Sequence, residues 1–178
     1  AEEQGAARKM LQLREMGFRA CEGYYSQHMN ACTWPCSITE MEPNDGMTQV
    51  YRDMILWADI ILVATPIRWG NASSLYFKMA ERLNCVQNQI TLKDKVLVKN
   101  KVASFIITGG QDNIHQVAGQ MMVFFTDIGF TFPPFSFLGW SRGWTAEDMD
   151  KNILQFKKSE YVTRTAKELV DNCVNTLQ

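Results

Sequence analysis

Residues 59–66 read Asp-Ile-Ile-Leu-Val-Ala-Thr-Pro, a continuous aliphatic run that a proline ends. A strand with apolar side chains on both faces is typical of a parallel sheet that helices cover on each side. We therefore predict that residues 59–65 form the central strand of such a sheet. Residues 102–107 are a second run of the same kind, and we expect the two strands to be neighbours.

Helical patterns surround and separate these two runs. The expected helices cover residues 47–57, 72–84, 114–128 and, with a break near 157–159, 145–175. Residues 130–138 predict a further strand, whose two prolines suit an edge position or a bulge better than the centre of a sheet. A short strand is expected at 9–13. This alternation of strands and helices predicts an α/β fold with a doubly wound parallel sheet.

The composition is that of an ordinary globular domain. Hydrophobic residues make up 46% and charged residues 21% of the 178 residues, and we expect residues 1–178 to form a single domain. The net charge of −1 gives no global field for nucleic acid or an anionic membrane, so neither is expected as a partner. No apolar run approaches a bilayer span and no signal peptide is evident, so we expect a cytoplasmic protein. Because Ala1 is not an initiator Met, we expect residues to precede it.

Residues 17–43 predict a long loop that holds Cys21, Cys32 and Cys36. Loops of this length in a compact domain are usually functional or disordered. The odd number of five cysteines and the absence of a secretory signal favour reduced thiols or a metal site over disulfides.

Two loops at the carboxyl ends of the predicted strands, residues 65–71 and 108–113, are the candidate ligand site. In doubly wound sheets, ligands bind outside the carboxyl ends of the strands. Trp69 offers a flat face, Arg68 offers planar donors, and Gly70 allows close approach of the backbone. These features favour a flat, polar-edged ring as the ligand. The alternatives are that both loops are ordinary turns and that Trp69 only caps the core.

Residues 58–78, ADIILVATPIRWGNASSLYFK, resemble the core motif of the NADPH-dependent FMN reductase and iron–sulfur flavoprotein branch of the flavodoxin-like superfamily. Residues 105–110, FIITGG, resemble its third flavin loop. The resemblance covers roughly residues 45–140 and implies a flavodoxin-like fold. It also implies flavin contacts at Pro66, Ile67, Arg68, Trp69, Gly70, Asn71, Gly109, Gly110, Gln111 and Asp112.

The sequence departs from this family in two places. The family opens with a strand and a phosphate-binding loop, whereas residues 1–6 resemble the end of the first helix, so the sheet is expected to lack its first strand and no phosphate-site residue is assigned. The iron–sulfur relatives carry four clustered cysteines, whereas only Cys21, Cys32 and Cys36 lie in the corresponding region. Three thiolates fall short of the four that usually hold a cluster. Cys85 would complete the set only if the fold brings it back, so we favour ordinary loop thiols and expect no metal.

The resemblance implies an FMN-binding oxidoreductase that uses NADPH or NADH to reduce free flavin, a quinone or a similar small electron acceptor. Because the cofactor performs the chemistry, no catalytic acid or base is nominated. The alternatives are an electron-transfer partner and a non-catalytic subunit of a larger redox complex. We also expect a homo-oligomer, because Tyr76, Phe77 and Met79 are spaced on the predicted 72–84 helix so that they cannot all face one core, and the helix is expected to expose them. The alternative is that these aromatic side chains pack under the long loop.

Overall fold

The computed structural model describes residues 5–109, 113–143 and 145–177. The contacts of the chain divide it into two compact units. Unit 1 comprises residues 1–58, 74–99 and 127–129, and unit 2 comprises residues 59–73, 100–126 and 130–178. A single domain over residues 1–178 stays a prediction.

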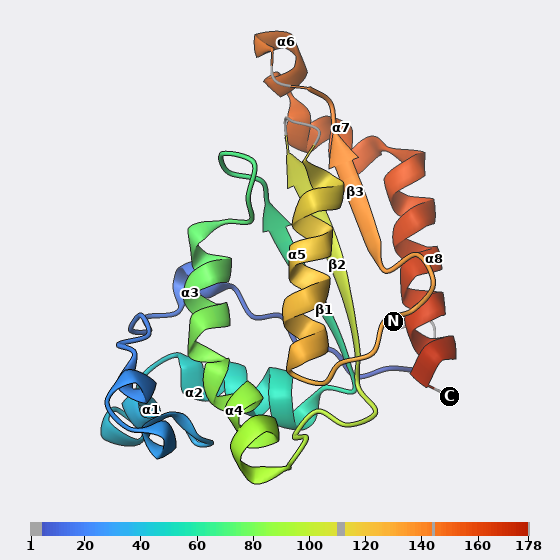
Figure 1. Cartoon of the computed structure of the whole chain (residues 1–178). Helices are drawn as coiled ribbons and strands as arrows, with labels where there is room; N and C mark the ends of the chain where they lie inside the picture. The colour runs from blue at the N-terminus through green and yellow to red at the C-terminus, as the bar shows by residue number, and fades with distance from the viewer. Residues whose placement is uncertain (1–4, 110–112, 144, 178) are drawn as a thin grey trace. The chain divides into compact units, whose positions relative to one another are not determined.

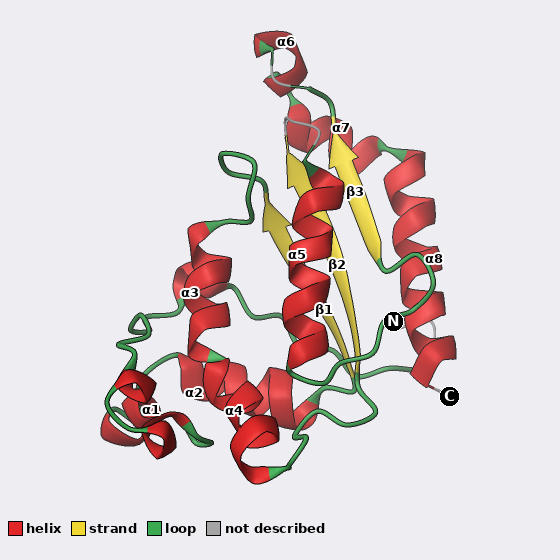
Figure 2. Cartoon of the chain, in the orientation of Figure 1, coloured by secondary structure: helices red, strands yellow, loops and turns green. Residues whose placement is uncertain are grey.

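Unit 2 holds a sheet of three parallel strands in the order β1 (Ile60–Pro66), β2 (Val102–Gly109) and β3 (Phe137–Ser141). Ile60 is opposite Val102 and Pro66 is opposite Thr108, so β1 and β2 end at the same edge of the sheet. Figure 2 shows the three strands side by side. The predicted α/β class with a parallel sheet is confirmed.

Helices cover both faces of this sheet. On one face, the rings of Phe105 in β2 and Phe125 in α5 (Ile114–Asp127) lie 5.5 Å apart between centroids. On the other face, Leu138 of β3 packs with Val162 and Leu169 of α8 (Glu160–Leu177). Because neighbouring side chains of a strand point to opposite faces, β2 supplies apolar groups to both helices, and this explains its nearly continuous burial. Figure 1 shows both helices beside the strands.

The prediction that residues 59–65 form the central strand is wrong, because β2 is central and β1 is an edge strand in the described sheet. Among the described residues, no strand pairs with the other side of β1. Leu62 retains 42% of its surface, and Ala64 is exposed too. α8 packs mainly against β2 and β3, so the face of β1 that carries Leu62 and Ala64 is only partly covered.

The C-terminal part of unit 2 differs in detail from the predicted pattern. The last strand begins at Phe137 rather than Phe130, because Pro133 and Pro134 precede it and cannot donate to the ladder. The helix predicted at 145–175 is three helices: α6 (Ala146–Met149), α7 (Asn152–Lys158) and α8. Thr145 and Asp148 form a capping box at the start of α6, and the expected break lies at Ser159.

Unit 1 is helical in the residues that the structure describes. Its elements are the 3₁₀ turns Leu13–Glu15, Tyr24–Ser26 and Met29–Cys32, the helices α1 (Ser37–Met41), α2 (Met47–Val50), α3 (Ser74–Arg82) and α4 (Asn84–Lys93), and a π-helix at Tyr51–Trp57 that continues α2. The prediction of a strand at 9–13 is wrong, because these residues form no strand and a 3₁₀ turn begins at Leu13. α4 has no counterpart in the sequence predictions.

The burial of α3 corrects one expectation. Tyr76 and Met79 are buried within the chain, and only Phe77 keeps 40% of its surface. Two of the three residues that suggested an oligomer are therefore buried in the chain itself, and α3 does not support that expectation. No helix in the described ranges has both the length and the hydropathy that a bilayer span requires.

Candidate functional site

The two predicted ligand loops leave the sheet of unit 2 together. β1 and β2 end side by side, and the first loop continues their pairing when the Ile67 N–H donates to the Thr108 carbonyl at 2.7 Å. Pro66 is the half-buried last residue of β1, and the Ile67 side chain is buried. Ile67 therefore helps to hold the first loop on the sheet. The outer residues of this loop remain accessible to a ligand.

The outer part of the first loop is a tight turn. The Arg68 N–H donates to the Asn71 carbonyl at 2.7 Å, and the Asn71 N–H donates back to the Arg68 carbonyl at 3.0 Å. Trp69 and Gly70 between them have φ of 51° and 73°. Positive φ at both central residues is the pattern of a type I′ turn, in which glycine at the second central position avoids strain.

This turn projects Trp69 away from the protein. Its side chain is 100% exposed, so the alternative that Trp69 caps the core is wrong. Arg68 and Asn71 are also exposed, and each makes a short-range bond: Arg68 Nη1 donates to the Ile67 carbonyl at 3.1 Å, and Asn71 Nδ2 donates to the Trp69 carbonyl at 3.3 Å. The turn presents an indole face with a cation and an amide beside it.

Asn113 ties the turn to the loop that follows β2. Its Nδ2 donates to the Gly70 carbonyl at 3.2 Å, and its own carbonyl accepts from the Val117 N–H in the first turn of α5. The resemblance did not select Asn113 as a site residue. An asparagine just before a predicted helix marks a helix start, but nothing local indicates that its amide reaches Gly70. Gly110, Gln111 and Asp112 lie outside the described residues.

Two of the predicted site glycines are required by the packing of the two loops. A Cβ on Gly70 would lie 2.6 Å from Asn113 Nδ2, and a Cβ on Gly109 would lie 2.7 Å from the Ile67 Cβ. Contacts this short force a neighbour to move. The glycines therefore allow the two loops to approach one another. From the sequence, we had expected Gly70 to allow the backbone to approach a ligand instead.

Replacing Gly70 with Ala is expected to destabilise unit 2, because a side chain at positive φ costs about 1–2 kcal/mol and the new methyl group also meets Asn113. Thermal unfolding of the parent, Gly70→Ala, Asn113→Ala and the double variant measures both effects. Removing the Asn113 amide should recover the steric part in the double variant and leave the part due to φ. Strictly additive losses would contradict the close contact between Gly70 and Asn113.

Unit 1 holds the cysteines that the sequence analysis singled out. No three of the His, Cys, Asp and Glu side chains in the described residues are placed to hold a metal ion. The fold does bring α4, which holds the buried Cys85, back to the cysteine loop, since Asn88 Nδ2 donates to the Cys32 carbonyl at 2.8 Å. Cys32 is also buried and accepts from Asn84 Nδ2 at 3.4 Å, and burial raises the pKa of its thiol.

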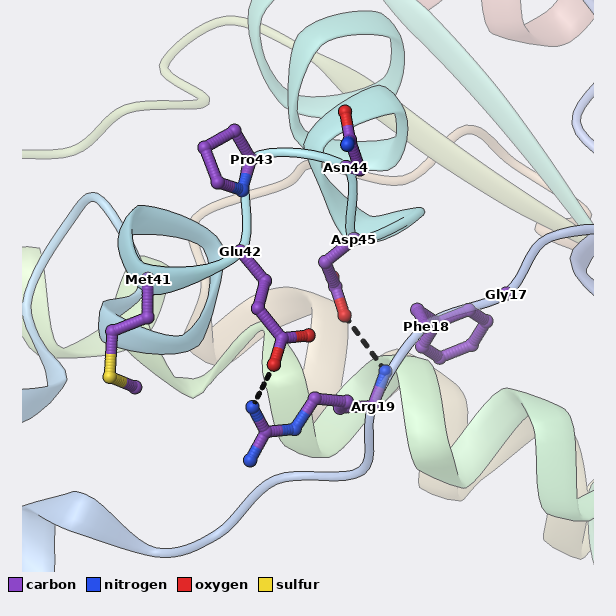
Figure 3. A pocket seen from close by; sticks show the side chains of 8 residues that line it. All are labelled: Gly17, Phe18, Arg19, Met41, Glu42, Pro43, Asn44 and Asp45. Atoms are coloured by element: carbon purple, nitrogen blue, oxygen red, sulfur yellow. Dashed lines mark hydrogen bonds and ion pairs between the residues drawn. The ribbon is translucent and has the colours of Figure 1, made fainter.

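A shallow pocket of about 490 Å³ also lies in unit 1 (Figure 3). Its lining residues come from two segments, 17–19 and 41–45. The Asp45 carboxylate accepts from the Arg19 N–H at 2.8 Å, and the Arg19 side chain pairs with Glu42. Since these polar groups satisfy one another, the pocket is a weaker candidate for a ligand site than the turn at Trp69.

Two curated proteins match parts of this chain. Over 77 residues the chain is 31% identical to the 8-demethyl-8-aminoriboflavin-5'-phosphate synthase of Streptomyces davaonensis. The matched segment covers 43% of this chain and 30% of that relative. Over 107 residues it is 25% identical to the divalent metal cation transporter MntH of Mycobacterium bovis, covering 60% of this chain and 16% of the relative. The chain thus spans less than a third of the curated relatives it matches.

A solved structure shares the fold. RosB, crystallised with a bound intermediate named 8-demethyl-8-formylriboflavin-5'-phosphate, superposes with a TM-score of 0.75 over 99% of this chain and 67% of its own. The two sequences are 20% identical, so the likeness shows the flavodoxin-like fold alone. Residues 1–145 match the model of the NADPH-dependent FMN reductase family, and the chain therefore belongs to that family.

Proposed function

We propose that this chain binds FMN at the turn of residues 66–71 and at the loop that follows β2, and that it serves as an NAD(P)H-dependent oxidoreductase. The observation that carries the proposal is the fully exposed Trp69 at the carboxyl end of β1, on a turn that Asn113 holds from the neighbouring loop. Membership of the NADPH-dependent FMN reductase family supports the same ligand and hydride donor. Free flavin, a quinone or a similar small molecule is the proposed electron acceptor.

The residues present suit a flavin ring. An indole face gives contact area to a flat heterocycle, and a loop fixed at both ends loses little freedom on binding. Arg68 places a positive charge beside that face and would complement negative charge on the flavin. Asn71 offers an amide for polar groups at the rim of the ring. FMN, when bound, supplies the hydride and electron chemistry, so the chain's own residues need only bind and orient it.

Titration of the purified chain with FMN, followed by flavin fluorescence quenching, tests the binding. We expect saturable binding, followed by steady NADPH oxidation when free FMN or a quinone is added in excess. Flavin binding without NADPH oxidation would favour the alternative of an electron-transfer partner. A chain that binds no flavin would favour the non-catalytic subunit and refute the proposal. We also propose that the chain forms a homo-oligomer and lies in the cytoplasm.

A further inference from the structure

The main chain of the turn at residues 66–71 already uses its hydrogen-bond acceptors. Each carbonyl oxygen of this segment accepts a bond from within the chain. The donors, in chain order of the carbonyls, are Thr65 Oγ1, Arg68 Nη1, the Asn71 N–H, Asn71 Nδ2, Asn113 Nδ2 and the Arg68 N–H. The side chains of Arg68 and Trp69 can only donate. A ligand that donates a hydrogen bond to this turn is therefore best met by a side-chain acceptor that is still unused.

Two side-chain oxygens at the turn are of this kind. Within the described ranges, no group donates to Oδ1 of Asn71 or to Oδ1 of Asn113. Asn71 is exposed, and its amide bonds to the Trp69 carbonyl, two residues away. Asn113 is half-buried, and it is held at two points, by its amide at Gly70 and by its carbonyl, which accepts from the Val117 N–H at 3.0 Å. Because its position is fixed before binding, Asn113 is the better acceptor of the two.

The orientation of the Asn113 amide follows from its partner. The Gly70 carbonyl can only accept, so the nitrogen of the amide must face it at 3.2 Å and the oxygen must point elsewhere. The amide nitrogen carries a second N–H, which Gly70 does not use. Asn113 therefore keeps one acceptor and one donor for a ligand, directly beside the turn that carries Trp69.

One edge of the isoalloxazine ring of FMN is the complement of such an amide. Its pyrimidine edge has two carbonyl oxygens with an N–H group, N3–H, between them. In the oxidised ring N3–H is the sole N–H donor, so a protein that reads this edge must supply an acceptor flanked by donors. The carboxamide of asparagine offers an acceptor and a donor on one planar group.

We propose that Asn113 binds the pyrimidine edge of the flavin, with its Oδ1 accepting from N3–H and its second amide N–H donating to a neighbouring ring carbonyl. This inference rests on the proposed flavin function and adds a residue that determines specificity. Trp69 gives contact area to any flat ring, whereas Asn113 distinguishes a ring that carries an N–H between two carbonyl groups. The same amide bonds to Gly70, so one side chain both shapes the turn and reads the ligand.

The affinity for FMN relative to 3-methyl-FMN tests this contact. The two flavins share the ring face, the ribityl chain and the phosphate, and a methyl group replaces the hydrogen at N3 in the second. Fluorescence quenching gives both dissociation constants. We expect the parent to bind 3-methyl-FMN about tenfold more weakly, because the half-buried Oδ1 of Asn113 loses its partner. Equal affinities in the parent would overturn the proposal.

Asn71→Ala is the matched control for Asn113→Ala, because each variant removes one asparagine amide that bonds to a carbonyl of the same turn. Asn113→Ala should bind the two flavins with dissociation constants within about twofold of one another. Asn71→Ala should keep the preference of the parent for FMN, whatever its effect on the affinity for both flavins. The proposal requires both results, and any other pair of results overturns it.

Asn113→Asp provides a second variant in case Asn113→Ala does not fold, which circular dichroism of the flavin-free protein establishes. Aspartate has the shape of asparagine, is favoured just before a helix, and keeps an oxygen for N3–H. It loses the donor to Gly70, so we expect weaker binding of both flavins with the preference for FMN preserved. Loss of that preference in Asn113→Asp would contradict an acceptor at residue 113.

Failure of the flavin site itself gives a different result from failure of this contact. A parent chain that binds neither flavin refutes the proposed function and this inference together. A parent chain that binds FMN and 3-methyl-FMN equally keeps the flavin site and removes the contact at Asn113. All these measurements are of binding, so they do not depend on the hydride donor or on the electron acceptor.

Discussion

Replacing Arg82 with Met is expected to lower the free energy of unfolding by about 3–5 kcal/mol, the cost of removing one partner from a buried ion pair. Arg82 and Asp45 are both buried in unit 1, and their side chains are joined by two hydrogen bonds of 3.1 and 3.2 Å. The substitution keeps an apolar side chain of comparable length and leaves the Asp45 carboxylate without its cation. Denaturant unfolding, followed by circular dichroism, measures the loss.

The double-mutant cycle with Asp45→Asn isolates the pair from the packing of Arg82. If the ion pair carries the effect, Arg82→Met with Asp45→Asn should be more stable than the sum of the two single losses predicts. Lys78→Met on the same helix is the surface control, since this side chain is less buried and makes a cation–π contact with Phe18. Equal losses for Arg82→Met and Lys78→Met would contradict the assignment.

The same pair predicts a dependence on acid. Burial acts to raise the pKa of Asp45, but hydrogen bonds from Arg82 and from the Arg19 N–H outweigh it, so the pKa lies below its usual value. A carboxyl group with a lowered folded-state pKa adds stability that is present above its unfolded pKa, about 3.9, and is lost as the pH falls through the folded value. The stability difference between the parent and Asp45→Asn should therefore shrink below about pH 4.

Replacing Trp69 with Ala is expected to raise the dissociation constant for FMN several-fold to about tenfold. Aromatic contact contributes about 0.5–1.5 kcal/mol beyond the burial of area, and 1.4 kcal/mol is a factor of ten. Because the Trp69 side chain is fully exposed in the structure, the melting temperature of the flavin-free protein should not change. Fluorescence quenching of flavin and thermal unfolding of the flavin-free chain measure the two quantities.

Phe135→Ala is the matched control for this experiment. Phe135 is also an exposed aromatic residue with positive φ in unit 2, but it precedes β3 and thus lies at the amino ends of the parallel strands. We expect its loss to leave FMN binding unchanged. If Trp69→Ala binds FMN as tightly as the parent, or if both variants weaken binding equally, the turn is not the flavin site.

The aliphatic run at 59–66 was enough to predict the parallel α/β sheet, because apolar side chains on both faces of a short strand require cover on both sides. The same argument located β2 and α5 to within about two residues. It placed β1 at the centre of the sheet, which was wrong, because hydrophobicity reports the cover that a strand needs and not which strands are present to pair with it. The proline-flanked start of β3 was placed too early for a related reason, since alternation alone does not locate the first ladder hydrogen bond.

At the candidate site, the resemblance selected the turn at Trp69, but only the tertiary structure showed how that turn is held. Asn113 meets Gly70 across 43 residues of chain, and Gly109 makes room for Ile67 from the neighbouring strand. Neither contact has a local signal, since residue types and spacing describe a segment and not the segment that packs against it.

In the interior of unit 1, too, the sequence determined one part of the arrangement and the tertiary structure decided the rest. Arg82 follows Met79 by three residues in α3, and residues with this spacing share a helix face, so the sequence by itself determined that this charge would lie on the same side as an apolar residue. Only the fold decided that the carboxylate of Asp45, 37 residues away in the sequence, would neutralise it. The physical reason is that periodicity along one helix reports which face is buried, whereas the partners of a buried charge are set by how distant segments pack.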